Sequence, residues 1–355
     1  MKSFNIAVLP GDGIGPEVMS QTLRVLQEVA PQIQTHTALI GGAAYSKYQC
    51  HFPPETQVLI EQCDAVLFGS VGGPINQANQ PQWKHCEVNS ILALRKQLNL
   101  AVNYRPVKFY PALHDISPLK NTILVDCDDI LILRELLGDI YFGKKHTFEN
   151  NGVMTAEDTA SYDENQIAYI AHQAFKAASG RTGRVTSVDK ANVLETSKLW
   201  RKVFNQVAQE YPDVTLNHML VDNCAMQLIL NPAQFDVIAT SNLFGDILSD
   251  AASALPGSLG MMPSASFNHE GFGLYEPSGG SAPDIAGFDQ ANPMAQILSL
   301  AMLLRHSFAM KFEANAIETA VSKTLEQAFR TRDIAQHNCQ LLGTVAFTDQ
   351  ILSNL

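Results

Sequence analysis

Strand-like and helix-like patterns alternate through the first hundred residues of the chain. The apolar runs at 4–10 and 64–70 suit buried strands, and in residues 15–30 and 89–100 apolar positions recur every three or four residues. Strands that alternate with such helices usually form a parallel sheet with crossover helices. This part of the sequence therefore predicts an α/β layer.

The rest of the chain continues the alternation, with two exceptions. A polar segment at about 144–162 has no clear period and is expected to form an extended arm or loop, and a Gly/Pro-rich loop from residue 273 leads into an apolar helix. A chain of 355 residues exceeds the size at which one core keeps growing, so two lobes are expected. Further strands are expected in 33–42, 123–136, 138–143, 183–194 and 213–222, a helix at 164–179, and a strand followed by a helix at 235–255.

A glycine-rich motif, VLPGDGIGPE at 8–17, follows the first apolar run. A Rossmann dinucleotide site needs a third glycine three residues after the second, and an acidic residue at the end of the next strand. Pro16 stands where the glycine is needed, and the next strand ends in Gly41 and Gly42. Asp12 would also put a negative charge among the amides that cradle a pyrophosphate. We therefore expect a nucleotide to bind elsewhere in the chain.

Composition and charge exclude several classes of partner. With 46% hydrophobic and 17% charged residues the chain resembles an ordinary globular protein, and its net charge of −11 disfavours nucleic acid and anionic membranes. No apolar stretch reaches the roughly 18 residues of a membrane span and no leader is recognised, so a soluble, cytoplasmic protein is expected. The cysteines show no CxxC spacing and are interpreted as buried thiols of a reducing compartment. They are Cys50, Cys63, Cys86, Cys127, Cys224 and Cys339.

Three aspartates have the chemistry of a site for a hard cation. Asp246 and Asp250 are four residues apart after a strand and would share one helix face, and Asp222 closes another strand-like run. Without a nearby His or Cys, such carboxylates suit Mg²⁺ or Mn²⁺. The alternative is that the pair at 246 and 250 only complements the dipole at the start of a helix.

Three arginines lie in or beside apolar segments of this acidic chain. Arg134 interrupts a strand, Arg105 ends another apolar run, and Arg95 lies in a helical stretch. Guanidinium groups pair bidentately with carboxylates, so together they suggest a clamp for a di- or tricarboxylate. The alternative for Arg134 is an ion pair with its neighbour Glu135.

Two further residues are candidate proton carriers. Tyr141 and Lys190 suit this role if burial or a nearby cation shifts their pKa values. The alternatives are that Tyr141 is a half-buried strand residue and that Lys190 pairs with Asp189.

Eight motifs, taken in order, resemble the β-decarboxylating dehydrogenases of the isocitrate/isopropylmalate family over nearly the whole chain. The combination of YFG with DKANVL resembles the isopropylmalate branch more than the isocitrate or D-malate branches. The resemblance implies a two-lobed α/β fold distinct from the classical Rossmann fold, with a cofactor-binding domain at 1–100 and 257–355 and a substrate, metal and dimerisation domain at 101–256. The motifs are LPGDGIGPEV, FGSVGGP, LRKQLNL, NYRP, IYFG, DKANVL, SNLFGDILSD and GGSAPDIAG with ANP.

The resemblance implies oxidative decarboxylation of 3-isopropylmalate to 4-methyl-2-oxopentanoate in leucine biosynthesis, with NAD and Mg²⁺ or Mn²⁺. Lys190 would accept the proton of the substrate hydroxyl, and Tyr141 would protonate the enol that remains after loss of CO₂. Lys190 and Asp222 would come from the second subunit of a homodimer, with the arm at 144–162 as an interface element. The implied substrate ligands are Arg95, Arg105, Arg134, Asp222, Ile91 and Leu92, and the implied metal ligands are Asp222, Asp246 and Asp250.

The resemblance also assigns the cofactor to the late loop. A carboxylate at Asp284 accepts from a free ribose hydroxyl and repels a 2′-phosphate, so NAD is expected rather than NADP. The alternative is that SAPD is only a turn sequence. The residues implied to contact the cofactor are Gly280, Ser281, Ala282, Pro283, Asp284, Ile285 and Asn292, with Glu87 near the nicotinamide.

Some positions depart from the family pattern. Leu137 and Asp139 stand where the pattern has Thr and Gly, and the lysine usual near residue 288 is missing. A related 2-hydroxy diacid such as D-malate, tartrate or homoisocitrate remains an alternative substrate, and a catalytically inactive dimer of the same fold remains an alternative function. Phosphoryl transfer at the glycine turn is disfavoured because the chain has no GK[ST] motif.

Overall fold

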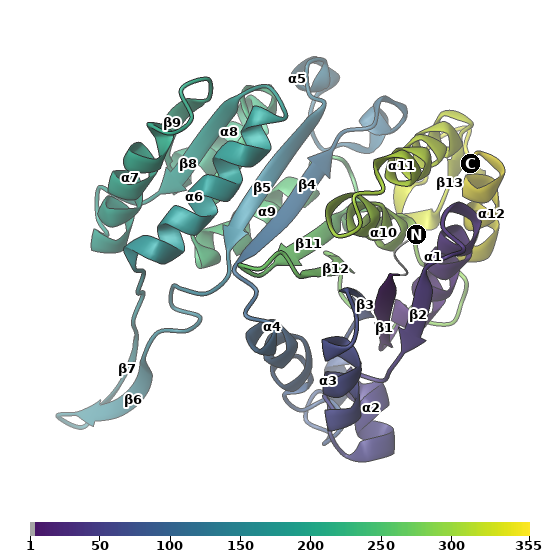
Figure 1. Cartoon of the computed structure of the whole chain (residues 1–355), viewed down its shortest axis with the longest axis horizontal. Coiled ribbons are helices and arrows are strands. Elements are labelled where there is room, and N and C mark those ends of the chain that lie inside the picture. Colours follow the sequence, from purple (N-terminus) through teal and green to yellow (C-terminus); the bar gives the residue numbers. More distant parts are fainter. Residues whose placement is uncertain (1–3) are drawn as a thin grey trace. The chain divides into compact units, whose positions relative to one another are not determined.

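The computed structural model describes residues 4–355, which form two compact units. Unit 1 contains the described residues up to Asn99 together with Tyr110–Ser117 and Pro256–Leu355. Unit 2 contains Leu100–Phe109 and Pro118–Leu255. Both units combine strands with covering helices, as the alternating pattern predicts (Figure 1).

Unit 1 contains five neighbouring strands in the order β2-β1-β3-β12-β11. The two N-terminal apolar runs form β1 and β3, which are parallel, so the predicted parallel layer is confirmed. Parallel strands covered on both faces are apolar throughout, and every residue of β3 is buried. β11 runs antiparallel to β12. The strands are β1 (Asn5–Gly11), β2 (Gln34–Thr37), β3 (Ala65–Ser70), β11 (Pro263–Phe267) and β12 (Gly273–Pro277).

The predicted apolar helix α10 forms the centre of unit 1. Its residues from Met294 to Leu304 are all buried, and it packs against β11, β12, α1 and α11. A helix that is apolar on every side requires such surroundings. The helices of this unit are α1 (Gly15–Val29), α2 (Gly41–Tyr48), α3 (Pro54–Glu61), α4 (Ala93–Gln97), α10 (Met294–His306), α11 (Lys311–Glu326) and α12 (Thr344–Ser353).

Three expectations for unit 1 need correction. The second strand ends at Thr37, and the glycines expected at its end begin α2. The helix expected at 89–100 is a π-helical segment, Val88–Leu92, followed by the short α4. The residues expected to open the late loop form β12, because GLYEP pairs with both β3 and β11.

Unit 2 contains five neighbouring strands in the order β4-β5-β10-β8-β9, with β4 antiparallel to β5 and the others parallel, in addition to the hairpin described below. Helix α6 begins and ends as predicted, and a capping box between Asp163 and Gln166 fixes its start. The strands are β4 (Val102–Lys108), β5 (Asp129–Glu135), β8 (Arg184–Asp189), β9 (Thr215–Leu220) and β10 (Val237–Thr240). The helices are α5 (Asn121–Leu124), α6 (Glu164–Ser179), α7 (Glu195–Ala208), α8 (Val221–Leu230) and α9 (Asn242–Ser253).

The polar segment without a clear period forms an antiparallel hairpin of β6 (Lys145–Asn150) and β7 (Val153–Asp158) that extends from unit 2 (Figure 1). Asn151 and Gly152 form its turn, with φ of 52° and 80°. Asn-Gly between two strands favours a type I′ hairpin, so the sequence did contain a signal for this element. Val153 and Met154 are exposed on the hairpin.

The cysteines are less buried than expected. All six are free, but only Cys86 and Cys224 are buried, while Cys50 is exposed and the other three are half-buried. The interpretation of all six as buried thiols is therefore wrong. Among residues 4–355, no helix is both long and apolar enough to cross a membrane.

Candidate active site

The glycine motif forms a tight turn, and the side chain of Asp12 in this turn occupies the N-terminus of α2. Gly13 has φ of 58°, and a Cβ there would lie 1.9 Å from the carbonyl oxygen of Ser281. The carboxylate of Asp12 accepts hydrogen bonds from the backbone N–H groups of Gly42 (2.8 Å) and Ala43 (2.7 Å), in the first turn of α2. Asp12 thus takes the place that an anion takes in a phosphate cradle. This agrees with the prediction that the fold is not a classical Rossmann fold.

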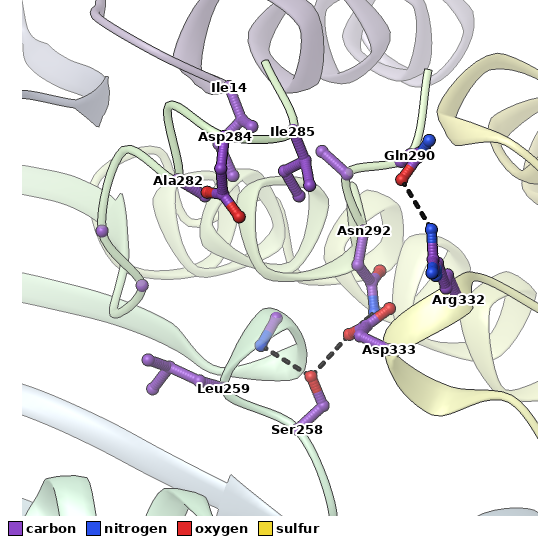
Figure 2. A pocket seen from close by; sticks show the side chains of 14 residues that line it. Ile14, Ser258, Leu259, Ala282, Asp284, Ile285, Gln290, Asn292, Arg332 and Asp333 are labelled. Atoms are coloured by element: carbon purple, nitrogen blue, oxygen red, sulfur yellow. Dashed lines mark hydrogen bonds between the residues drawn. The ribbon is translucent and has the colours of Figure 1, made fainter. Parts of the chain in front are cut away.

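A cavity of about 720 Å³ lies in unit 1 beside this turn (Figure 2). The late loop supplies much of its wall, and Asp284 points its carboxylate into it. Of the residues that the resemblance assigns to the cofactor, Gly280, Ala282, Asp284, Ile285 and Asn292 line the cavity. Ser281, Pro283 and Glu87 are not part of its lining.

Residues distant in sequence complete the cavity. Asp333 accepts hydrogen bonds from the Ser258 hydroxyl (2.5 Å) and from the Asn292 side-chain amide (3.0 Å). This contact fixes the orientation of the Asn292 amide at the cavity wall (Figure 2). The residues that the sequence analysis missed here are Ile14, Ser258, Leu259, Gly260, Gly279, Gln290, Ala291, Arg332 and Asp333.

Glu87 is exposed and lies next to the late loop. A Cβ built on Gly72 would lie 3.7 Å from Glu87 Oε1 and 3.4 Å from the Ser281 hydroxyl oxygen. Gly72 thus leaves space between these two predicted cofactor residues. Ile91 is buried and Leu92 is 38% exposed, both in the π-helical segment before Arg95.

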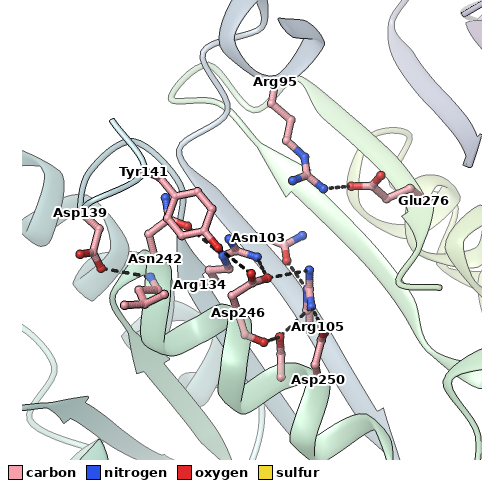
Figure 3. A network of polar contacts seen from close by, with 12 residues as sticks. Arg95, Asn103, Arg105, Arg134, Asp139, Tyr141, Asn242, Asp246, Asp250 and Glu276 are labelled. Atoms are coloured by element: carbon pink, nitrogen blue, oxygen red, sulfur yellow. Dashed lines mark hydrogen bonds and ion pairs between the residues drawn. The ribbon is translucent and has the colours of Figure 1, made fainter. Parts of the chain in front are cut away.

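Arg95 has a carboxylate partner of its own within unit 1. Its Nη2 donates to Oε1 of Glu276 on β12 at 2.7 Å (Figure 3). Glu276 is buried, so the ion pair orients the guanidinium. The sequence analysis did not identify Glu276, because an acidic residue in a short strand carries no motif.

The other two predicted arginines meet the predicted aspartates in unit 2. Arg134 on β5 forms an ion pair with Asp246 on α9, and Arg105 on β4 donates to Asp250 at 2.7 Å (Figure 3). The arginine side chains are 5% and 10% exposed, whereas those of Asp246 and Asp250 are 36% and 63% exposed. Two buried cations therefore lie beneath two accessible carboxylates.

A glycine allows α9 to approach the strand so closely. A Cβ on Gly245 would lie 2.7 Å from the Cβ of Arg134. The alternative explanations of these residues do not hold. Asp246 and Asp250 lie beyond the first turn of α9, where the helix dipole has little effect. Glu135 does not neutralise Arg134, because it accepts from backbone N–H groups of the following turn.

Three polar residues that the sequence analysis missed hold the arginines in place. Asn242 accepts from Arg134 Nε at 3.0 Å, Asn103 accepts from Arg105 Nε at 2.8 Å, and the Ser249 hydroxyl accepts from Arg105 Nη1 at 2.7 Å. Each arginine is thus bound on several sides, which fixes its side-chain conformation.

Tyr141 joins this cluster from a turn after β5 and not from a strand, which corrects the expectation. Its hydroxyl donates to Asp246 at 2.7 Å, and the guanidinium of Arg134 lies 5.3 Å from its ring centroid. Burial, followed by the nearby carboxylate of Asp246, raises the pKa of Tyr141. The hydroxyl is therefore protonated at neutral pH and has the state required of a proton donor.

Lys190 and Asp222 pair with each other at a different place in unit 2. Lys190 Nζ lies 2.5 Å from Asp222 Oδ1, and this hydrogen bond lowers the pKa of Asp222. Asp222 lies in the first turn of α8 and does not close a strand, since β9 ends at Leu220. Asp189 pairs with Arg201 at 2.6 Å, so the alternative pairing of Lys190 is wrong.

The three predicted metal ligands do not converge within one chain. In the part of the chain that the structure describes, no three His, Cys, Asp or Glu side chains lie close enough together to hold a metal ion. Asp246 and Asp250 share one face of α9, but Asp222 is paired with Lys190 and its side chain is 64% exposed. One chain thus brings together two of the three oxygen donors.

Comparison with known proteins gives consistent results. The sequence profile described as isocitrate/isopropylmalate dehydrogenase matches residues 5–351. Proteins named 3-isopropylmalate dehydrogenase from Nitrosomonas europaea and Thermotoga maritima are 52% and 50% identical, with 99% of each chain covered.

Two solved structures are similar to this chain over nearly its whole length. Isocitrate dehydrogenase from Methylococcus capsulatus superposes with a TM-score of 0.86 at 32% identity, with 99% of each chain covered. A β-decarboxylating dehydrogenase from Thermococcus kodakarensis gives 0.81 at 32% identity, covering 99% of this chain and 96% of that one. With a profile that spans the chain and relatives about half identical to it, this chain belongs to the isocitrate/isopropylmalate dehydrogenase family.

Proposed function

We propose that this protein catalyses the NAD- and divalent-metal-dependent oxidative decarboxylation of 3-isopropylmalate to 4-methyl-2-oxopentanoate, a cytoplasmic step of leucine biosynthesis. The observation that carries the proposal is the cluster of Arg105, Arg134, Asp246, Asp250 and Tyr141 on adjacent elements. The names of relatives about half identical over the whole chain support a decarboxylating dehydrogenase and favour this substrate.

The donor set of the cluster fits a hard divalent cation. Asp246 and Asp250 present carboxylate oxygens on one helix face, the ligand type that Mg²⁺ and Mn²⁺ prefer. Asp222, exposed and outside this cluster, would supply the third carboxylate from the second subunit. When bound, the cation supplies positive charge that stabilises anionic substrate oxygens, and NAD supplies the hydride acceptor.

The surface of α8 supports a homodimer with shared sites. Met226, Ile229 and Leu230 are about half exposed on one face of α8, and Ile247 is 59% exposed on the neighbouring α9. Apolar side chains clustered in this way mark an interaction surface. A symmetric dimer through this surface would bring Asp222 and Lys190 of each copy towards the other copy's cluster, and the hairpin with its exposed Val153 and Met154 would add contacts.

The chain's own residues then have distinct tasks. The role proposed for Arg95, Arg105 and Arg134 is to bind substrate carboxylates by paired hydrogen bonds. Lys190 accepts the proton of the substrate hydroxyl, directly or through water. Tyr141, which the raised pKa keeps protonated, donates a proton to the enol left by decarboxylation.

The cavity of unit 1 supports the proposed cofactor site. Its volume and its loop backbone suit the adenosine half of a dinucleotide. Asp284 carries a negative charge at the wall, which accepts from a ribose hydroxyl and repels a 2′-phosphate, so NAD is preferred to NADP. Ile91 and Leu92, one turn before Arg95, would contact the isopropyl group.

The direct test is the appearance of NADH absorbance with 3-isopropylmalate and Mn²⁺, for the wild type and for Lys190→Met. We expect activity in the wild type and its loss in the variant, with an unchanged circular dichroism spectrum. Equal turnover in both proteins would remove Lys190 from the mechanism. D-malate, tartrate and homoisocitrate serve as the comparison panel, and failure with every diacid would favour an inactive dimer.

A further inference from the structure

The turn that leads to Tyr141 is tied to the start of α9 by buried polar groups. Glu135, which is 1% exposed, accepts from the backbone N–H of Leu137 (2.7 Å) and of Gly138 (2.9 Å). Asp139, 7% exposed, accepts from the backbone N–H of Leu243 at 3.0 Å. The turn therefore cannot move without breaking its hydrogen bonds to the Glu135 carboxylate or to α9.

Tyr162 links the two sides of this arrangement. Its hydroxyl oxygen accepts from the backbone N–H of Asn242, the first residue of α9, at 2.9 Å, and forms a hydrogen bond with Glu135. Burial and the nearby carboxylates of Glu135 and Asp139 raise the pKa of Tyr162, so its proton stays in place and is donated to Glu135.

The ring of Tyr162 is fixed as well as its hydroxyl. A Cβ on Gly138 would lie 2.3 Å from Tyr162 Cε1, so the ring packs directly on the turn. On its other side the ring meets Trp200 edge-on, with centroids 5.7 Å apart. The side-chain amide of Asn242 completes the connection by donating to the carbonyl of Gly138 at 3.3 Å.

These contacts hold both partners of the hydrogen bond between Tyr141 and Asp246. Asp139, which is tied to α9, stands two residues before Tyr141 in the same turn, and the helix carries Asp246 one turn after Asn242. Tyr141 and Asp246 are themselves 2.7 Å apart. We propose that Glu135 and Tyr162 are positioning residues, which lock the turn against α9 and thereby place the Tyr141 hydroxyl for proton donation. This inference rests on the proposed function of Tyr141.

A double-mutant cycle separates positioning from a general contribution to stability. Tyr162→Phe removes only the hydroxyl that joins Glu135 to α9, and Tyr141→Phe removes the proposed proton donor. We expect Tyr162→Phe to lower kcat about tenfold while the KM for 3-isopropylmalate changes less than about threefold. In the Tyr141→Phe background the same substitution should change kcat less than about twofold, because the group that it positions is already absent.

Tyr104→Phe is the matched control. Its hydroxyl donates to Gln173 at 3.0 Å in the same unit, and burial raises the pKa of Tyr104, yet it touches neither the turn nor α9 through that contact. We expect it to lower thermal stability by an amount similar to that of Tyr162→Phe but to leave kcat unchanged. If Tyr162→Phe does not fold, Glu135→Gln, which keeps the side-chain shape, replaces it in the double-mutant cycle with Tyr141→Phe.

The possible outcomes distinguish the two proposals. Equal losses of kcat from Tyr162→Phe in both backgrounds, or no loss in either, would overturn the positioning role and leave the proposed function intact. If Tyr141→Phe alone leaves kcat unchanged, the proposed role of Tyr141 fails, and the positioning role fails with it.

Discussion

Two polar groups of unit 2 differ in how completely one chain builds them. The cluster of Arg105, Arg134 and Asp246 is held by buried strands, by α9 and by amide and hydroxyl partners on several sides. Lys190 and Asp222 have each other at 2.5 Å, on side chains that are 28% and 64% exposed. The difference indicates that the first group is assembled on folding, whereas the second is exposed where another molecule can reach it.

Neutralising one aspartate of each group should give the largest difference, because we expect both variants to lose activity but only one to lose stability. Asp246→Asn leaves the buried guanidinium of Arg134 without its counter-charge, so we expect the free energy of unfolding to fall by about 3 kcal/mol. Activity should fall at least about a thousandfold, since the cation, substrate and Tyr141 contacts are all affected. Asp222→Asn should abolish activity to a similar degree but leave urea unfolding unchanged. A comparable loss of stability in both variants would contradict the distinction.

Glu135, buried next to Arg134 of the first group, also predicts that stability depends on pH. Burial raises the pKa of Glu135 to about 7, from an ordinary value of 4.5. The folded protein holds this proton more tightly than the unfolded chain, so stability is lost as pH rises from about 4.5 to about 7. At about 1.4 kcal/mol per pKa unit, the wild type should lose on the order of 3 kcal/mol relative to Glu135→Gln over that interval. Urea unfolding of both proteins at several pH values measures the difference, and parallel curves would refute it.

Mixed subunits test whether the exposed pair serves a second chain. We expect Lys190→Met and Asp246→Asn proteins, each inactive alone, to regain activity when refolded together. In a shared-site dimer, random pairing leaves about a quarter of all sites with both native residues, and so about a quarter of wild-type activity. A mixture that stays inactive while forming mixed dimers would show that each site is built by one chain.

The smallest effect is expected at the turn itself. Asp139 has φ of 71°, which favours glycine, but its carboxylate caps α9 through Leu243. Asp139→Gly removes the backbone strain and the cap together, two terms of about 1 kcal/mol each with opposite sign. The midpoint of thermal unfolding should therefore change by only a few degrees. Asp139→Ala, which keeps the strain and loses the cap, should destabilise the protein more.

The sequence predicted the elements whose signals are local. Helix α6 matches because its capping box lies within four residues, and Asp246 and Asp250 share a face because their spacing alone places them so. The Asn-Gly turn of the hairpin was also local, but the polar strands around it hid the period that identifies a strand.

Other features depend on tertiary contacts that no local pattern contains. Asp333 joins Ser258 and Asn292 across the cavity, and Glu276 reaches Arg95 from a strand that was expected to be a loop. Tyr162 carries no motif, and its connection to the turn is seen only in tertiary contacts, namely the packing of its ring on Gly138 and the hydrogen bonds of its hydroxyl. The residues of a candidate site were thus easier to predict than the residues that orient them.

Asp12 has a consequence for how the glycine turn can evolve. Because its carboxylate accepts from the free amides at the start of α2, the turn supplies its own acceptor for this helix end. Free phosphate or sulfate should not compete with ligands at this helix end, however high its concentration. Shortening that one side chain would leave these amides without their acceptor. A single substitution would then leave the N-terminus of α2 open to an external anion.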